Sequence, residues 1–177
     1  MYKHRVLITE EEIRERCKEL ARTLNTDYQG RTLDIICTLK GAVFFAADLM
    51  RELTIPVRLH FIQVSSYGSS TENSGTIHLH FSSAFDLQHR DVLLVEDILD
   101  TGITLDYLVK HLSEKNPSSL KTCILLDKPE RRKLDINPDY KGFEIPDVFV
   151  IGYGLDYNEF GRNLSYIAEL DPSEYGK

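Results

Sequence analysis

The stretch 91–105, DVLLVEDILDTGITL, constrains the fold of this chain more than any other part of its sequence. Its four consecutive apolar residues 92–95 are typical of a parallel strand that is buried on both faces. Acids follow at once, and a Thr-Gly-Ile-Thr turn then leads into a helical apolar pattern that begins at Leu105. Ligands of open α/β sheets bind at such strand ends, and the free N–H groups of a helix start attract phosphate.

The acids Glu96, Asp97 and Asp100 have two readings. Acids after a buried strand can form a solvated turn that caps the next helix. Three acids within five residues, joined to a Thr-Gly-x-Thr turn, favour a ligand site over that reading.

Strands and helices are expected to alternate along most of the chain. The patterns predict helices at 10–24, after a Thr9–Glu12 capping box, at 42–53 and at 105–115, and strands at 34–39, 57–64, 76–81, 92–95, 120–126 and 146–151. No repeat or linker divides the sequence. We therefore expect residues 1–177 to form a single α/β domain with a mainly parallel central sheet and helices on both faces.

Composition excludes some classes of function. The net charge of −7 argues against broad nucleic-acid or membrane attachment, which needs a basic surface. The three cysteines are far apart among apolar neighbours, as reduced core thiols are, which favours the cytoplasm. We find neither a signal peptide nor an apolar run long enough to span a membrane.

Three segments carry alternative interpretations. The polar loop 65–75 is longer than a tight turn and is more often a functional loop than idle surface. In the strand after it, His78 and His80 share one face, but no third ligand is near in sequence, so a solvent-facing pair is favoured over a metal site. The basic run 128–133, KPERRK, is expected to be mostly solvated, with Lys128 at the strand end as the exception.

Several polar groups are expected at the carboxyl ends of strands, where a parallel sheet would bring them to one edge. They are Lys40, Glu96, Asp97, Lys128 and Asp156. The sequence has no P-loop, dinucleotide fingerprint, zinc spacing or nucleophile elbow. Acids, lysines and backbone amides suit a phosphorylated sugar that is bound with Mg²⁺.

The central stretch closely resembles the phosphoribosyl-pyrophosphate motif of the type I phosphoribosyltransferase family. The resemblance extends over most of the chain, in the order LKG at 39–41, SSYG at 65–68, LLDKPERR at 125–132 and PDVFVIGYGLDYNEFGR at 146–162. Within the family, the chain most resembles the short bacterial branch, and this resemblance implies action on hypoxanthine and guanine. The resemblance also implies a small hood that is formed by the terminal segments.

The resemblance implies roles for the residues around the sugar donor. Glu96 and Asp97 would hold the ribose hydroxyls and, with Asp156, a Mg²⁺ ion. The 5′-phosphate would lie in the loop of Asp100, Thr101, Gly102, Ile103 and Thr104, with no side-chain contact expected from Ile103. Pyrophosphate would be bound by Leu39, Lys40, Gly41 and Arg162, and the 39–41 loop often has a non-proline cis peptide in this family. Ser66 and Tyr67 would belong to a lid that closes over it.

For the purine, the resemblance makes Phe149 a stacking surface and Val150 a source of backbone hydrogen bonds. Lys128 would donate to the exocyclic O6, Asp156 would lie beside the base, and Asp100 would take the N7 proton. The implied reaction transfers the phosphoribosyl group to N9 of a 6-oxopurine and gives IMP or GMP with pyrophosphate. A homodimer or homotetramer is implied, whereas the order of preference among hypoxanthine, guanine and xanthine is not.

Two other classes of function stay open at this point. A regulator with this fold could sense phosphoribosyl pyrophosphate and bind nucleic acid, but it would need a basic face or an added segment. A phosphoacceptor receiver domain also has an acidic strand end like LLVED, but it places its paired acids near the N-terminus and has no Thr-Gly-x-Thr loop.

Overall fold

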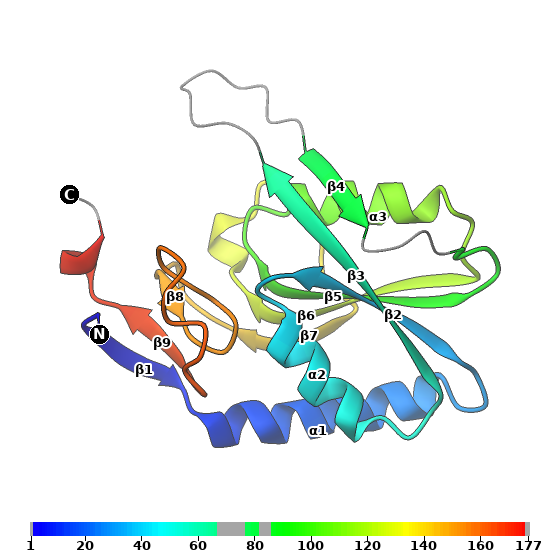
Figure 1. Ribbon diagram of the computed structural model, residues 1–177, viewed down its shortest axis with the longest axis horizontal. Helices are drawn as coiled ribbons and strands as arrows, with labels where there is room; N and C mark the ends of the chain where they lie inside the picture. Colours follow the sequence, from blue (N-terminus) through cyan, green and yellow to red (C-terminus); the bar gives the residue numbers. More distant parts are fainter. Residues whose placement is uncertain (1, 67–76, 82–85, 176–177) are drawn as a thin grey trace.

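A six-stranded sheet forms the centre of the computed structural model, which describes residues 2–66, 77–81 and 86–175 (Figure 1). Its spatial order is β4 (Ile77–Phe81), β3 (Val57–Ser66), β2 (Leu33–Leu39), β5 (Asp91–Leu99), β6 (Ser119–Asp127) and β7 (Tyr140–Glu144). β4 pairs antiparallel with β3, and the other neighbours pair in parallel. The predicted mainly parallel sheet is therefore confirmed, with β5 near its centre.

Helices cover both faces of this sheet, as predicted. α1 (Glu10–Asp27) and α2 (Val43–Glu52) lie on one face, and α3 (Ile103–Ser113) lies on the other (Figure 1). The capping box at the start of α1 is present, because Thr9 accepts from the backbone of Glu12 while the Glu12 carboxylate accepts from Thr9 N. This arrangement satisfies two backbone donors that a helix start otherwise leaves free.

The central strand is buried on both faces, which is why its apolar residues run without a break. Leu93 and Val95 belong to the core cluster under α1 and α2, whereas Val92 and Leu94 belong to the cluster under α3. Successive side chains of a strand point to opposite faces, so each residue in this run fills one of the two cores.

The two terminal segments meet in a small antiparallel sheet, the hood (Figure 1). β1 (His4–Ile8) pairs with β9 (Ile167–Leu170), and β9 pairs with β8 (Val150–Ile151). The described residues also form two short 3₁₀ helices: η1 (Pro129–Arg131) follows β6, and η2 (Pro172–Glu174) follows β9. The hood implied by the resemblance is therefore present.

The predicted strand at 146–151 was wrong in extent and in place. Only Val150–Ile151 is a strand there, and it belongs to the hood and not to the parallel sheet. The fifth parallel strand is β7, which the sequence patterns missed because its residues YKGFE show neither an apolar run nor a regular alternation. Its Gly142 fits close to β6, since a Cβ there would lie 2.3 Å from the backbone oxygen of Leu125.

Some predictions fall outside what the structure describes. Tyr67 and most of the proposed lid lie outside the described residues, although Ser66 ends β3. His78 and His80 lie in β4, but their side chains are not described. In the described part of the chain, no helix is long and apolar enough to cross a membrane.

Candidate functional site

A cavity of about 460 Å³ opens at the carboxyl ends of β2 and β5. Most of the residues predicted for the sugar donor line it, namely Leu39, Lys40, Gly41, Glu96, Asp97, Asp100, Thr101, Gly102, Thr104 and Arg162. The parallel sheet brings together the residues that follow β2 and those at the end of β5, as expected, whereas Arg162 reaches the cavity from the loop after β8.

Glu96 and Asp97 lie inside β5 and not after it, so the predicted end of this strand was too early. The Glu96 carboxylate accepts from Asp97 N at 3.1 Å, and the Asp97 carboxylate accepts from Ile98 N at 2.8 Å. Burial and the neighbouring Asp97 carboxylate raise the pKa of Glu96 well above its usual value. The acid pair is thus held by the backbone and offers oxygen atoms to hydroxyl groups or to a hard cation.

The turn between β5 and α3 places a helix start at the cavity. Gly102 is the residue before the helix and has φ +87°, a left-handed conformation that glycine adopts without strain. Glycine has no side chain that could cap the helix, and the Thr101 hydroxyl oxygen accepts a long hydrogen bond, 3.4 Å, from Ile103 N instead. Ile103 is exposed and does not line the cavity.

The loop that follows β2 fits closely against the acid pair. The Leu39–Lys40 peptide bond is cis, as the resemblance implied. A Cβ on Gly41 would lie 1.5 Å from Oδ2 of Asp97, so only glycine leaves room for this carboxylate. On its other side, a Cβ on Gly154 would lie 2.0 Å from Gly41 O. The loop after β8 therefore packs directly on the 39–41 loop.

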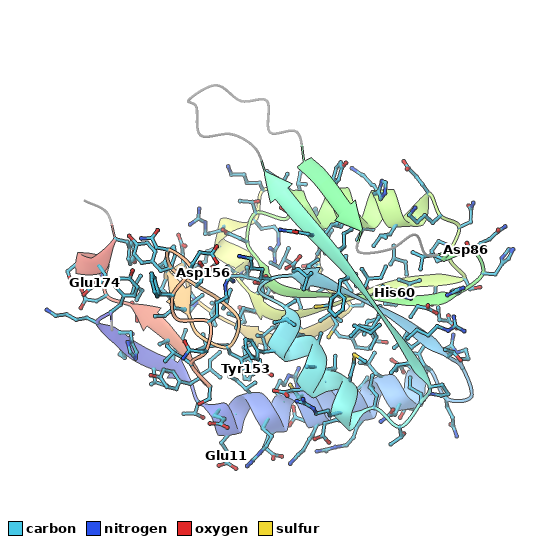
Figure 2. The ribbon with its side chains drawn as sticks, in the orientation of Figure 1. Glu11, His60, Asp86, Tyr153, Asp156 and Glu174 are labelled. Atoms are coloured by element: carbon cyan, nitrogen blue, oxygen red, sulfur yellow. The ribbon has the colours of Figure 1, made fainter. Side chains whose placement is uncertain are left out.

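Arg162 joins the loop after β8 to the cavity. Its Nη1 donates to Gly154 O at 2.8 Å, and its Nη2 lies 2.7 Å from Asp156 Oδ1. Lys40 pairs with Glu159 of the same loop at 2.9 Å. Figure 2 shows Asp156 on this loop, between the hood and the large sheet. Asp156 was expected at the end of a parallel strand, and instead it lies on this loop, where it pairs with Arg162 at the edge of the cavity.

The residues predicted for the purine lie outside the cavity lining. They are Lys128, Phe149, Val150 and Asp156. Lys128 is buried, which lowers the pKa of its ammonium group, and its Nζ donates to Val148 O at 2.6 Å. Its backbone N–H donates to Leu99 O at 3.0 Å, which ties it to the end of β5. Lys128 thus connects the cavity to the segment that carries Phe149.

Phe149 belongs to a cluster of aromatic side chains in the hood. Its ring centre lies 5.5 Å from that of Tyr157, edge-on, and 5.1 Å from that of Tyr175. Phe149 is partly exposed, whereas Val150 next to it is buried in the small sheet. No local sequence pattern points to either tyrosine, because aromatic contacts between a loop and the C-terminal segment depend on the tertiary fold.

Sequence reasoning also missed Thr38 and Arg132. Thr38 lines the cavity, and its hydroxyl donates to Val95 O at 3.0 Å. Arg132 lies in the run expected to be solvated, but its side chain is only 13% exposed and pairs with buried Asp127. It also donates to the carbonyl oxygens of Leu99 and Asp100 at 3.1 and 2.7 Å. The strand-end position that identified Lys128 could have pointed to Thr38, but not to Arg132.

No three His, Cys, Asp or Glu side chains within the described ranges are grouped closely enough to hold a metal by themselves. Glu96 and Asp97 offer two adjacent carboxylates, and the Asp156 carboxylate is engaged by Arg162. These donors suit a hard cation that takes its remaining ligands from water and a bound substrate.

The family model for the phosphoribosyl transferase domain matches residues 8–158. The chain belongs to this family. It is 46% identical over 178 residues to the hypoxanthine-guanine phosphoribosyltransferase of Bacillus subtilis, covering 99% of each chain. It is 47% identical over 176 residues to the enzyme of that name from Mycobacterium avium, covering 96% of this chain and 87% of the relative.

Solved structures of phosphoribosyl transferases share the fold. The hypoxanthine phosphoribosyltransferase of Staphylococcus aureus superposes with a TM-score of 0.91 at 44% identity, covering 98% of this chain and 94% of that one. The hypoxanthine-guanine phosphoribosyltransferase of Bacillus anthracis gives 0.90 at 44% identity, covering 97% of this chain and 100% of that one. The two-sheet architecture is therefore that of the family, and a receiver domain is excluded.

Proposed function

We propose that this protein is a hypoxanthine-guanine phosphoribosyltransferase of purine salvage. It transfers the 5-phosphoribosyl group from phosphoribosyl pyrophosphate to N9 of hypoxanthine or guanine, and pyrophosphate leaves. The observation that carries the proposal is the single cavity where an acid pair, a helix start and two basic side chains meet. The names and high identity of the relatives support the same activity.

Each wall of the cavity suits one part of the sugar donor. The carboxylates of Glu96 and Asp97 accept from the 2′- and 3′-hydroxyls of ribose. The turn from Asp100 to Thr104 surrounds the 5′-phosphate with backbone N–H groups and threonine hydroxyls, at the positive end of α3. The 39–41 loop and Arg162 then face the pyrophosphate.

Mg²⁺ is the cofactor that we propose for this site. Glu96 and Asp97 would hold it, Asp156 would act largely through water, and substrate oxygen atoms would supply further ligands. When bound, the cation neutralises charge on the departing pyrophosphate.

The purine is recognised beside the cavity. Lys128 donates to the exocyclic O6 of a 6-oxopurine, and the amino group of adenine cannot accept there. For this contact its Nζ must turn from Val148 O toward the base. Phe149 stacks on the purine ring, Val150 provides backbone hydrogen bonds, and Asp156 lies at the edge of the base.

Proton transfer is assigned to Asp100. As N9 attacks the anomeric carbon, the C–O bond to pyrophosphate breaks and the ribose ring becomes oxocarbenium-like. Asp100 takes the proton from N7 of the purine, and the carboxylates of the site favour the positive charge on the sugar. Ser66 and Tyr67 would belong to the lid that excludes water from the activated sugar.

We also propose a cytoplasmic location, a single domain over residues 1–177 and a homodimeric or homotetrameric assembly. Three buried free thiols support a reducing compartment. Burial raises the pKa of Cys17 to about 11 and that of Cys37 to about 12, so these cysteines have the character of unreactive core thiols.

The proposed function is tested with the purified protein, phosphoribosyl pyrophosphate, Mg²⁺ and each of hypoxanthine, guanine, xanthine and adenine. We expect release of pyrophosphate with hypoxanthine or guanine and none with adenine. Removal of Mg²⁺ with EDTA should stop the reaction, and added Mg²⁺ should restore it. Binding of phosphoribosyl pyrophosphate without turnover of any purine would instead support a regulator.

A further inference from the structure

The turn that follows β6, residues 128–132, touches both halves of the proposed site. On the purine side, Lys128 Nζ donates to Val148 O at 2.6 Å. On the phosphate side, Arg132 Nη1 donates to Asp100 O at 2.7 Å. The turn is therefore placed to link the segment that receives the purine with the loop that receives the sugar phosphate.

Arg131, between these two residues, bridges the same two segments with its side chain. Its Nε lies 2.9 Å from Asp100 Oδ1, in the phosphate loop. Its Nη1 donates to Asp147 Oδ1 at 3.3 Å, two residues before Phe149. A guanidinium group presents its N–H donors in a rigid planar fork, so one arginine can fix two carboxylates relative to each other.

Among the described residues, Arg131 is the ion-pair partner of the Asp100 carboxylate. Its Oδ1 is buried and accepts no hydrogen bond from the described residues. The approach of Arg131 is close enough for an ion pair, although the N–H is not aligned with the oxygen as in a hydrogen bond. Because Arg131 holds Oδ1, Oδ2 is left as the oxygen that can face the purine.

We propose that Arg131, anchored by Asp147, is a positioning residue that orients Asp100 toward N7 of the purine. This inference rests on the proposed function, and in particular on proton transfer to Asp100. It assigns a role in the reaction to a side chain that does not line the cavity.

The effect is expected on turnover and not on folding. The side chains of Arg131, Asp100 and Asp147 are 47%, 38% and 47% exposed, and ion pairs at such positions contribute little to stability. A small displacement of a reacting group, in contrast, can lower a rate by roughly 10²-fold.

The test compares Arg131→Gln with the wild-type protein and with Lys133→Gln. The control removes the same charge from an exposed side chain two residues away that has no ion pair among the described residues. We expect Arg131→Gln to lower kcat by roughly tenfold, with the KM for phosphoribosyl pyrophosphate and the unfolding temperature almost unchanged. Lys133→Gln should retain wild-type kcat.

A double-mutant cycle then separates positioning from a general effect. If Arg131 acts through the Asp100 carboxylate, Arg131→Gln should cause no further loss in an Asp100→Asn background. Asp147→Asn should lower kcat less than Arg131→Gln does, and it should have no effect once Arg131 is replaced.

Three results would overturn the inference. They are an unchanged or raised kcat in Arg131→Gln, an equal loss in Lys133→Gln, and losses that multiply in the double variant. A wild-type protein that turns over no purine would remove the proposed function and the inference with it. If the wild-type protein turns over purine and any of the three results is found, only the proposed role of Arg131 is removed.

Discussion

Replacing Gly41 with alanine should disable the acid pair without removing any acid. The added methyl group would lie 1.5 Å from Oδ2 and 2.5 Å from Cγ of Asp97, which is far inside van der Waals contact. The Asp97 side chain must therefore rotate away. It then loses its hydrogen bond from Ile98 N, which is 2.8 Å long, and its place at the ribose and the cation.

The size of the effect follows from these contacts. Overpacking of a well-packed site costs about 1–3 kcal/mol, which for a chain of this size lowers the unfolding temperature by about 2–4 °C for each kcal/mol. A hydrogen bond to a charged group contributes roughly 1.5–3 kcal/mol. Loss of one such bond from Asp97 to ribose should weaken phosphoribosyl pyrophosphate binding by about 10- to 150-fold.

Calorimetric titration of phosphoribosyl pyrophosphate with Mg²⁺, together with thermal unfolding, measures both quantities. Gly30→Ala is the control, because nothing lies within 4 Å of a Cβ added at Gly30. Since Gly30 has φ +76°, this variant should lose some stability but should bind phosphoribosyl pyrophosphate as the wild type does. In an Asp97→Ala background, Gly41→Ala should no longer weaken binding. Wild-type affinity and unfolding temperature in Gly41→Ala would refute the steric argument.

Three further predictions concern the acids and the lysine of the site. Asp100→Asn should lower turnover by roughly 10²–10⁴-fold while phosphoribosyl pyrophosphate still binds; near wild-type kcat would remove the general base. Lys128→Ala should weaken hypoxanthine binding much more than phosphoribosyl pyrophosphate binding, and equal losses in titrations of the two would assign the lysine to the phosphates. The pKa of Glu96 is raised in the folded protein, so above pH 4.5 the folded state binds more protons at this residue than the unfolded state does. The contribution of Glu96 to stability should therefore fall as the pH rises from 4.5 toward the folded-state pKa. Glu96→Gln should remove that slope from unfolding temperatures measured against pH, and an identical slope in both proteins would contradict it.

The extent of successful prediction differed between the two sheets. β2, β3 and β6 were found within two residues of their ends, because buried parallel strands read as apolar runs. β5 was found at its start, but its predicted end was four residues too early because the acids at 96 and 97 interrupt the apolar run. β7 escaped because an edge strand need bury less, and its half-buried residues carry no such run. The hood strands are two to five residues long and depend on pairing between distant segments.

The candidate site shows the same division. Residues contiguous in sequence, such as Glu96, Asp97 and the turn at Gly102, were identifiable from spacing and residue type. Arg132 was expected in solvent because it lies in a run of charged residues. Its partners Asp127 and Leu99 lie at the ends of β6 and β5, and the local sequence does not show that these ends meet. Such contacts become visible only when the strands are placed side by side.

The sequence by itself determined the parallel sheet, its central acidic strand and the phosphate-binding turn, because hydrophobic period and local turn chemistry are written in neighbouring residues. The tertiary structure decided that Gly41 makes room for Asp97, that Gly154 packs on the 39–41 loop and that Arg131 reaches two carboxylates. These contacts join residues that are distant in the chain. Their distances are set by how strands and loops pack, and no local pattern encodes that packing.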